Sequence, residues 1–324
     1  MNRSRIKVAG ADAVYHCIGR IVGGEMLLGE PEKEVMRKSM WRLADFCGVE
    51  IITYCFMSNH VHLLVRVPAE EDIIDAEIVR RVVRLYGKGE TWIQNIVHGF
   101  QETGNLSSST RMALQARMGD ISVFMKEFKQ RFSKWYNRRH GRFGTLWAER
   151  FKSLLVEESA EAIQTISMYI DLNPVRAGLV EDPKDYRFCG HGEAVAGSTT
   201  IRREVVRFLG ESSWRRAAAE YRKTMMVYGA EATRAKQAVI PRATVAKILS
   251  EGGLPRPGQL LRLRVRYFND GLVLGSREFV EGVFEQFRDR FGSRRNQGAR
   301  PMRAMGMLAG SLVTARDLRV KVVE

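Results

Sequence analysis

Two histidines separated by a single valine are the residues of this sequence with the clearest capacity for chemistry. His60 and His62 open the apolar run 61–67, which ends at Pro68 and is typical of a buried strand. Side chains two positions apart on a strand point to the same face, about 7 Å apart, so both imidazoles could bind one metal ion. Two polar residues on a solvated strand face are the alternative, but this strand is apolar.

A tyrosine and an asparagine form a second candidate group more than one hundred residues downstream. Ser159 can cap a helix that Pro174 must end or distort, because proline lacks an N–H and restricts the residue before it. Tyr169 and Asn173 are four positions apart and share a face if the helix persists. The amide oxygen could then be a third metal ligand beside the two imidazoles, and the phenol could lie next to the metal. On the sequence alone, Tyr169 is more simply a packing residue.

A basic segment with interleaved glycines and aromatics lies between these two groups. A helix is predicted from Asp120, a good N-cap, and it runs into residues 138–152. Cations there can meet phosphates, and rings can stack on bases of a single strand. A core-packed helix with a solvated basic face is the alternative. Arg176, further along the chain, is added to this group. The candidate DNA-binding residues are therefore Arg138, Arg139, Arg142, Trp147, Arg150, Lys152 and Arg176.

Three of these segments resemble the REP-associated tyrosine transposases, which are single-tyrosine HUH transposases of the insertion-sequence type. The segments read MSNHVHLL from Met57, GTLWAERF from Gly144 and YIDLNPVRAG from Tyr169, and the resemblance covers about residues 10–192. The resemblance implies that Tyr169 is the nucleophile and that His60, His62 and Asn173 hold the metal. Tyr136 is the rival tyrosine and ranks well behind.

The resemblance also implies an activity. A divalent metal, Mg or Mn, would assist cleavage of single-stranded DNA folded as a hairpin, such as a repetitive palindromic element, through a 5′-phosphotyrosine link that a 3′ hydroxyl can later reverse. No nucleotide cofactor is implied. Two alternatives stay open: a transposase-derived protein that binds nucleic acid without cutting it, and a phosphoesterase that uses His60 or His62 directly. The chain could act as a monomer or a homodimer.

Composition agrees with a polyanionic partner. The 324 residues carry 52 Lys and Arg against 37 Asp and Glu, a formal net charge of +15 and a pI of about 9.9. No apolar run approaches the roughly 18 residues of a transmembrane helix, and no apolar segment follows the basic N-terminus. The four cysteines lie far apart, without a C-x-x-C pair. A reduced, cytoplasmic protein without membrane contact is expected.

The elements that must position these residues predict an α+β protein. Residues 13–22 form a strand, a helix starts near Pro31 and ends at Gly48, and a second strand over residues 49–54 leads into the histidine strand. This order is the first half of a ferredoxin-like antiparallel sheet with helices on one face.

The chain is predicted to contain two domains. The catalytic domain spans residues 1–193 and has an insertion at about 69–119. Small residues indicate a linker over 194–205, and 206–324 is expected to be a basic, mainly helical accessory DNA-binding domain.

Overall fold

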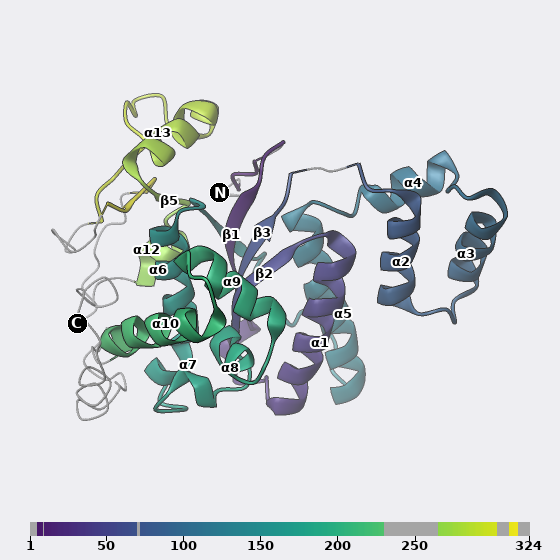
Figure 1. Cartoon of the computed structure of the whole chain (residues 1–324), viewed down its shortest axis with the longest axis horizontal. Helices are drawn as coiled ribbons and strands as arrows, with labels where there is room; N and C mark the ends of the chain where they lie inside the picture. The colour runs from purple at the N-terminus through teal and green to yellow at the C-terminus, as the bar shows by residue number, and fades with distance from the viewer. Residues whose placement is uncertain (1–4, 9, 70–71, 230–264, 303–310, 317–324) are drawn as a thin grey trace.

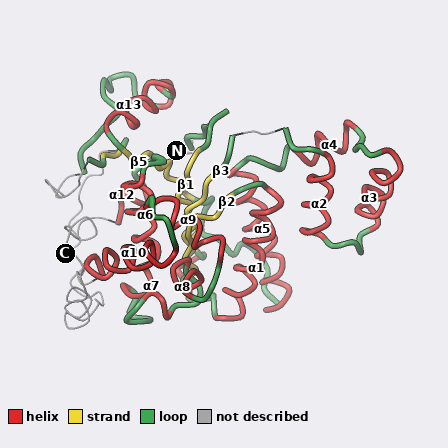
Figure 2. Tube along the Cα trace, in the orientation of Figure 1, coloured by secondary structure: helices red, strands yellow, loops and turns green. Residues whose placement is uncertain are grey.

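The computed structural model describes residues 5–8, 10–69, 72–229, 265–302 and 311–316 (Figure 1). A mixed β-sheet with helices on both faces forms the body of the molecule, and a helical arm projects from one side. Figure 2 shows the strands enclosed between the helices. The α+β class predicted from the sequence is therefore confirmed.

The N-terminal half folds as a ferredoxin-like unit. Its elements are β1 (Ala13–Arg20), α1 (Glu30–Cys47), β2 (Glu50–Phe56), β3 (His60–Val67), α5 (Ile121–His140) and β4 (Lys152–Val156). The four strands lie in the order β2-β3-β1-β4, and each neighbouring pair is antiparallel. Helices α1 and α5 pack on each other beside the sheet. This is the arrangement that the sequence predicted.

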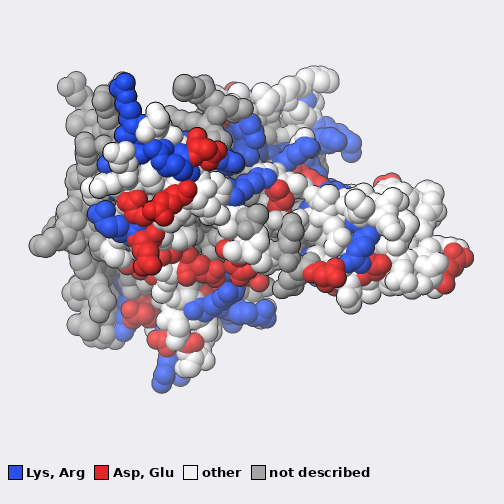
Figure 3. Space-filling view, turned by 90° about the horizontal axis from the view of Figure 1, so that it is seen from above, with Lys and Arg blue, Asp and Glu red and all other residues white. Residues whose placement is uncertain are grey.

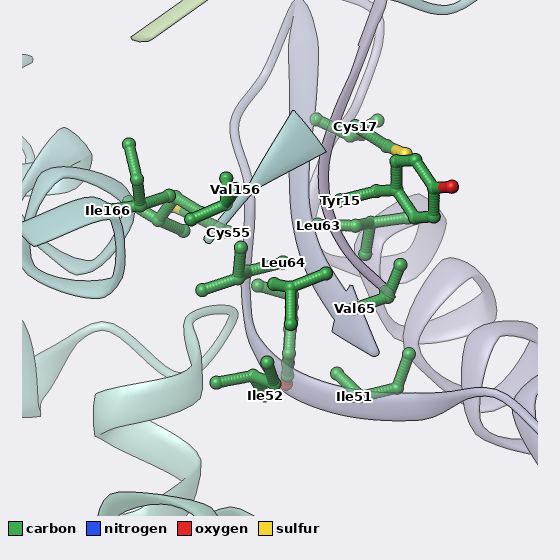
Figure 4. Packing of buried hydrophobic residues seen from close by; sticks show 14 of the residues in the cluster. Tyr15, Cys17, Ile51, Ile52, Cys55, Leu63, Leu64, Val65, Val156 and Ile166 are labelled. Carbon is green, nitrogen blue, oxygen red and sulfur yellow. The ribbon is translucent and has the colours of Figure 1, made fainter. Parts of the chain in front are cut away.

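Later helices cover the opposite face of the sheet. The sequence had predicted helices on one face only, and the structure has helices on both. They are α6 (Ala160–Asp171), α7 (Asn173–Arg176), α8 (Gly190–Val195), α9 (Thr199–Leu209), α10 (Trp214–Gly229) and α12 (Val265–Asp270). The physical reason is visible in β3, where every residue after His60 is buried. A strand that is buried on both faces requires cover on both faces. Figure 4 shows apolar side chains on both sides of the strands, with Tyr15 beside Leu63 and Ile166 on the opposite side.

The C-terminal region is mainly helical, yet it adds two short strands to the same sheet. β5 (Val273–Gly275) pairs parallel to β4, and β6 (Val313–Thr314) pairs antiparallel to β5, so the sheet is six-stranded and mixed. Helix α13 (Arg277–Gln286) lies next to them. Ser276 caps this helix: its side chain accepts the Phe279 N–H. Strands of two and three residues are too short to leave a periodic pattern in the sequence.

The insertion after β3 forms the projecting arm (Figure 1). It consists of α2 (Asp75–Tyr86), α3 (Thr91–Thr103) and α4 (Ser108–Gln115). Helix α2 packs on α1, and Arg80 and Arg84 on α2 both form ion pairs with Asp45. The arm therefore lies on the α1 side of the sheet, away from the face that carries α6.

The range 194–205, expected to be a linker, is largely helical. Helix α8 ends at Val195 and α9 begins at Thr199, where the Ser198 hydroxyl accepts the Ile201 N–H. The structure thus has only a short turn at this point. Where one domain ends and the next begins stays a prediction, as does the role of residues 206–324. The sequence pattern also predicts a short helix over residues 244–251, and this range lies outside the described residues.

Short 3-10 helices occur at Val22–Gly24, Pro183–Asp185 and Arg288–Arg290. The cysteines Cys17, Cys47, Cys55 and Cys189 are all free and buried. Within the described parts of the chain, no helix is both long and apolar enough to cross a membrane.

Candidate active site

A cavity of about 490 Å³ opens on the face of the sheet that carries α6, where β3, α6, α7 and α12 meet. Its lining brings together the residues that the sequence singled out, although they lie more than one hundred positions apart: His60, His62, Tyr169, Asn173 and Arg176. Arg20 and Asn269 also line it. The spatial meeting of the histidine strand and the tyrosine helix is therefore a property of the fold.

His62 lies at the inner end of the cavity. It is 2% exposed, and its Nδ1 atom lies 2.9 Å from Nε2 of His16 on the neighbouring strand β1. The other ring nitrogen of His16, Nδ1, lies 2.9 Å from the backbone oxygen of Phe268 in α12. The two imidazoles are stacked with their centroids 5.1 Å apart. Sequence reasoning missed His16, since no motif surrounds it.

His60 lies nearer the mouth of the cavity and is partly exposed. Its Nδ1 atom lies 2.7 Å from Oδ1 of Asn59, whose Nδ2 donates a hydrogen bond to the Gly24 oxygen at 3.2 Å. The His60 and His62 rings lie edge to face, 5.0 Å apart between centroids. Both side chains line the same cavity, as the two-residue spacing on a strand requires.

Burial keeps both imidazoles in the neutral form. Desolvation lowers the pKa of His60 to about 4, and the nearby positive charge of Arg20 acts in the same direction. Desolvation also holds the pKa of His62 well below 6.5, with a further contribution from His60. At pH 7 both rings therefore carry a lone pair, which is the form that binds metal ions.

Tyr169 projects from α6 toward the histidines. Helix α6 starts at the predicted cap, where Ser159 Oγ accepts the Ala162 N–H. Tyr169 is 3% exposed, its ring lies edge-on to His62 at 5.7 Å, and its hydroxyl donates to Asn269 Oδ1 at 3.3 Å. Asn269 was not identified from the sequence, because it comes from the C-terminal region and belongs to no recognisable pattern.

Asn173 begins α7 after the break that Pro174 imposes on the helix. Its Nδ2 atom donates to the backbone oxygens of Tyr169 at 2.9 Å and Ile170 at 3.0 Å. These two bonds occupy the amide nitrogen, so Oδ1 is the atom that can act as a ligand in the cavity.

His60, His62 and Asn173 offer two imidazole nitrogens and one amide oxygen to the same cavity. Across the described residues, no three His, Cys, Asp or Glu side chains gather to hold a metal. A metal at His60 and His62 would therefore take its remaining ligands from an amide oxygen and from water or substrate. The amide oxygen and water suit Mg²⁺ or Mn²⁺, whereas the imidazole nitrogens suit softer divalent ions.

Arg176 places a positive charge beside the tyrosine. Its Nη1 donates to the Tyr169 backbone oxygen at 3.0 Å, and its guanidinium lies 5.2 Å from the centre of the Tyr169 ring. Its Nη2 is buried and has no hydrogen-bond partner among the residues that the structure describes. Burial lowers the pKa of Arg176 to about 10, so the group remains charged at pH 7. An unpartnered cation in a cavity is suited to an anion such as a phosphate.

The basic segment is divided between surface and interior. Arg138, Arg139 and Arg150 are exposed, whereas Trp147 is 7% exposed and its Nε1 donates to Ser133 Oγ at 2.9 Å. The indole packs on β1, where a Cβ added to Gly19 would lie 3.1 Å from it. The expectation that Trp147 stacks on a base is therefore corrected to a packing role. Phe143, which is 93% exposed, is the aromatic in this segment that is open to solvent.

A second cavity, of about 870 Å³, adjoins the first at Asn269. Six cationic side chains from the N-terminal segment, the β4 region and the C-terminal region line it: Arg5, Lys7, Arg150, Lys152, Arg290 and Arg316. Four of these were not identified from the sequence, because chain segments far apart in sequence contribute them. Lys152 pairs with Asp270 at 3.0 Å, so part of the charge is already balanced.

Tyr136, the rival nucleophile, lies elsewhere. It belongs to α5, which packs with α1 on the opposite face of the sheet, and it is 5% exposed. Its ring stacks on His140 with centroids 4.3 Å apart. It does not line the cavity that holds the two histidines.

Comparison with known proteins found a family model and a partially similar solved structure. No curated protein matches the chain. One solved structure with partial similarity is that of a REP-associated tyrosine transposase bound to a REP hairpin, with 14% identity, 61% of this chain and 86% of that chain covered, and a TM-score of 0.35. Residues 11–93 match the family model of the IS200-like transposases. The family resemblance seen in the sequence is thus confirmed over the range that holds β1, β2, β3 and both cavity histidines.

Proposed function

We propose that this protein is a transposase that cuts and rejoins single-stranded, hairpin-bearing DNA through a phosphotyrosine at Tyr169. The observation that carries the proposal is the single cavity shared by His60, His62, Tyr169 and Asn173. The family match over residues 11–93 supports the same reaction class. Among the residues that the structure describes, no other tyrosine lines this cavity.

In the proposed reaction, Tyr169 attacks the phosphate and Arg176 stabilises the negative charge. The guanidinium would bind a non-bridging oxygen of the scissile phosphate and stabilise negative charge on the phenol oxygen. The Tyr169 oxygen forms a bond to phosphorus while the bond from phosphorus to the 3′ oxygen breaks. The phenol proton passes to water, and the departing 3′ oxygen takes up a proton from water. A Mg or Mn ion held by His60, His62 and Asn173 would polarise the phosphate.

The link to Tyr169 retains the energy of the broken phosphodiester bond. A 3′ hydroxyl can therefore attack the phosphotyrosine, release the tyrosine and join a new DNA end. This reversibility is what makes the same residue serve cleavage and strand transfer, and it requires no nucleotide cofactor.

The DNA would approach over the cations of the basic segment 138–152. We assign this role to Arg138, Arg139, Arg142, Arg150 and Lys152, together with Arg176 inside the site. Trp147 is left out because it packs in the interior. Exposed Phe143 could stack on a base where the sequence-based expectation had placed Trp147.

The proposal can be tested with a labelled hairpin oligonucleotide, Mn²⁺ and a denaturing gel. We expect wild-type protein to produce a cleaved strand and a slower protein-linked strand, and EDTA to abolish both. Tyr169→Phe should bind the hairpin and fail to cut it, whereas the matched control Tyr136→Phe should cut it. Cleavage by Tyr169→Phe would refute the assignment. Binding without cleavage by the wild type would indicate a binding protein that does not cut.

A further inference from the structure

A chain of hydrogen bonds runs from the C-terminal region to the inner histidine of the site. It starts at the backbone oxygen of Phe268 in α12, passes through both ring nitrogens of His16 and ends at Nδ1 of His62, with 2.9 Å at each step. His16 is fully buried. Three segments that lie far apart in sequence therefore meet at one imidazole.

The direction of each hydrogen bond follows from its terminal acceptor. A carbonyl oxygen can only accept, so the proton of His16 is on Nδ1. His16 is buried and forms no ion pair with a described residue, so its ring is neutral and Nε2 is an acceptor. Nδ1 of His62 must then donate to it. The lone pair of His62 is thereby left on Nε2.

A shorter series of hydrogen bonds fixes the tautomer of His60 in the same way. The Gly24 oxygen accepts from Asn59 Nδ2, which orients the amide so that Asn59 Oδ1 accepts from Nδ1 of His60. His60 therefore also carries its lone pair on Nε2. The two imidazoles thus share one tautomer, which two different partners select.

We propose that His16, anchored on α12, is a positioning residue that fixes the tautomer and ring orientation of His62 for metal binding. The inference rests on the proposed function, which assigns His62 as a ligand. It makes the C-terminal region a structural part of the metal site. Partners of this kind orient metal-bound histidines, and their loss typically weakens metal binding about 10–100-fold.

The tautomer can be measured directly on the intact, metal-free protein. Long-range ¹H–¹⁵N correlation spectra of ¹⁵N-histidine-labelled protein contain only six imidazoles. We expect His16, His60 and His62 to be protonated on Nδ1 alone. A His62 ring protonated on Nε2 would overturn the inference, and this measurement requires no variant.

Metal affinity gives a second test that is independent of cleavage. Mn²⁺ binding is followed from the EPR signal of free Mn²⁺ in wild type, His16→Phe and His16→Gln. The Gln side chain can still accept from His62, so we expect affinity within about threefold of wild type, whereas Phe should weaken binding about 10–100-fold. His98→Phe, on the exposed arm, is the matched control and should change nothing.

The outcomes separate the inference from the proposed function. If wild type forms the DNA adduct and His16→Phe binds Mn²⁺ as well as wild type, only the inference fails. If no adduct forms and His16→Phe still weakens Mn²⁺ binding while His16→Gln does not, the inference stands and the function fails. Absence of Mn²⁺ binding to wild type overturns the inference.

Discussion

Burial keeps several histidines of this protein neutral, and this applies also to a histidine outside the cavity that holds His60 and His62. His191 begins the turn of α8, is 2% exposed and has no hydrogen-bond partner for either ring nitrogen among the described residues. Desolvation lowers its pKa to about 4, against a weaker opposing effect of Asp182. The folded protein thus holds this ring neutral at a pH where the unfolded chain would protonate it.

Replacing His191 should therefore reduce the sensitivity of the fold to acid. Above pH 6.5, the ordinary pKa of histidine, the ring is neutral in both the folded and the unfolded chain. As the pH falls from 6.5 toward 4, only the unfolded chain binds the proton, so the folded state loses stability. The loss amounts to about 2 kcal/mol between pH 7 and pH 5. We expect the free energy of unfolding of His191→Leu, measured in urea at both pH values, to fall by about 2 kcal/mol less than that of wild type. Equal losses would contradict the buried neutral ring.

Single residues also show how far sequence reasoning reached. His60, His62, Tyr169 and Asn173 were predicted from spacing and from family motifs, and the structure places them around one cavity. Their roles stay predictions until they are measured. The partners His16, Asn59 and Asn269 were missed, because a contact such as that of His16 with Phe268, 252 positions apart, follows from the fold and leaves no local pattern.

Among the elements, β3 carries an ion-pair cluster around the buried Arg66 that ties the sheet to α9. Arg66 is 2% exposed and bonds Glu50 at 2.7 Å, Glu158 at 2.7 Å and Glu204 at 2.8 Å. Glu204 belongs to α9 and is itself buried. The three acids come from three elements, so one guanidinium holds β2, the end of β4 and α9 together.

Removing this cation should destabilise the protein strongly. Arg66→Met keeps most of the side-chain volume but leaves buried Glu204 without its partner, and we expect a loss of about 3–5 kcal/mol in urea unfolding. Arg207, which bonds Glu50 and Glu158 from a half-exposed position, provides the matched control. Arg207→Met should cost about 1 kcal/mol or less. Equal effects of the two variants would contradict the cluster.

Helix α12 supplies the hydrogen-bond partner of the proposed nucleophile. Asn269 accepts from the Tyr169 hydroxyl, so its loss should leave the phenol less well positioned while the DNA contacts persist. We expect Asn269→Ala to cut the hairpin about tenfold more slowly, with an unchanged dissociation constant for the DNA. Asn105→Ala, on the arm, serves as the control. An unchanged cleavage rate in Asn269→Ala would show that α12 does not position the tyrosine.

For the whole molecule, the net charge of +15 does not show where DNA would bind. Figure 3 shows Lys and Arg in several groups that alternate with Asp and Glu on that face. The cations that line the second cavity are therefore of greater interest than the total, since they adjoin the site at Asn269. A single strand leaving the active site would meet them next.

This path predicts a charge effect that depends on position. Arg150 is exposed and lines the second cavity, whereas Lys88 is exposed on the arm between α2 and α3. Arg150→Glu should weaken binding of the hairpin oligonucleotide and lower the slope of log affinity against log salt by about 1, while Lys88→Glu should leave both unchanged. Fluorescence anisotropy at several salt concentrations measures both quantities. Equal slopes in the two variants would exclude the path.

The sequence predicted the first half of the fold, and its prediction of the second half was incomplete. Alternating and apolar runs identified β1, β2 and β3, and the helix signals at Pro31 and Asp120 identified α1 and α5. The cover on the second face was not predicted, because amphipathic helices such as α9 do not reveal which surface they pack on. Strands β5 and β6 were also missed, since β5 pairs with β4 from a distant part of the sequence and β6 pairs only with β5.

The central claim is that the oxygen of Tyr169 becomes covalently bonded to DNA. The most direct measurement is mass spectrometry of the protein after reaction with a hairpin oligonucleotide and Mn²⁺, followed by digestion with nuclease and trypsin. We predict a nucleotide adduct on the tryptic peptide 153–176, in which Tyr169 is the only tyrosine. An adduct on any other peptide, Tyr136 included, or cleaved DNA with no adduct on the protein, would contradict the account.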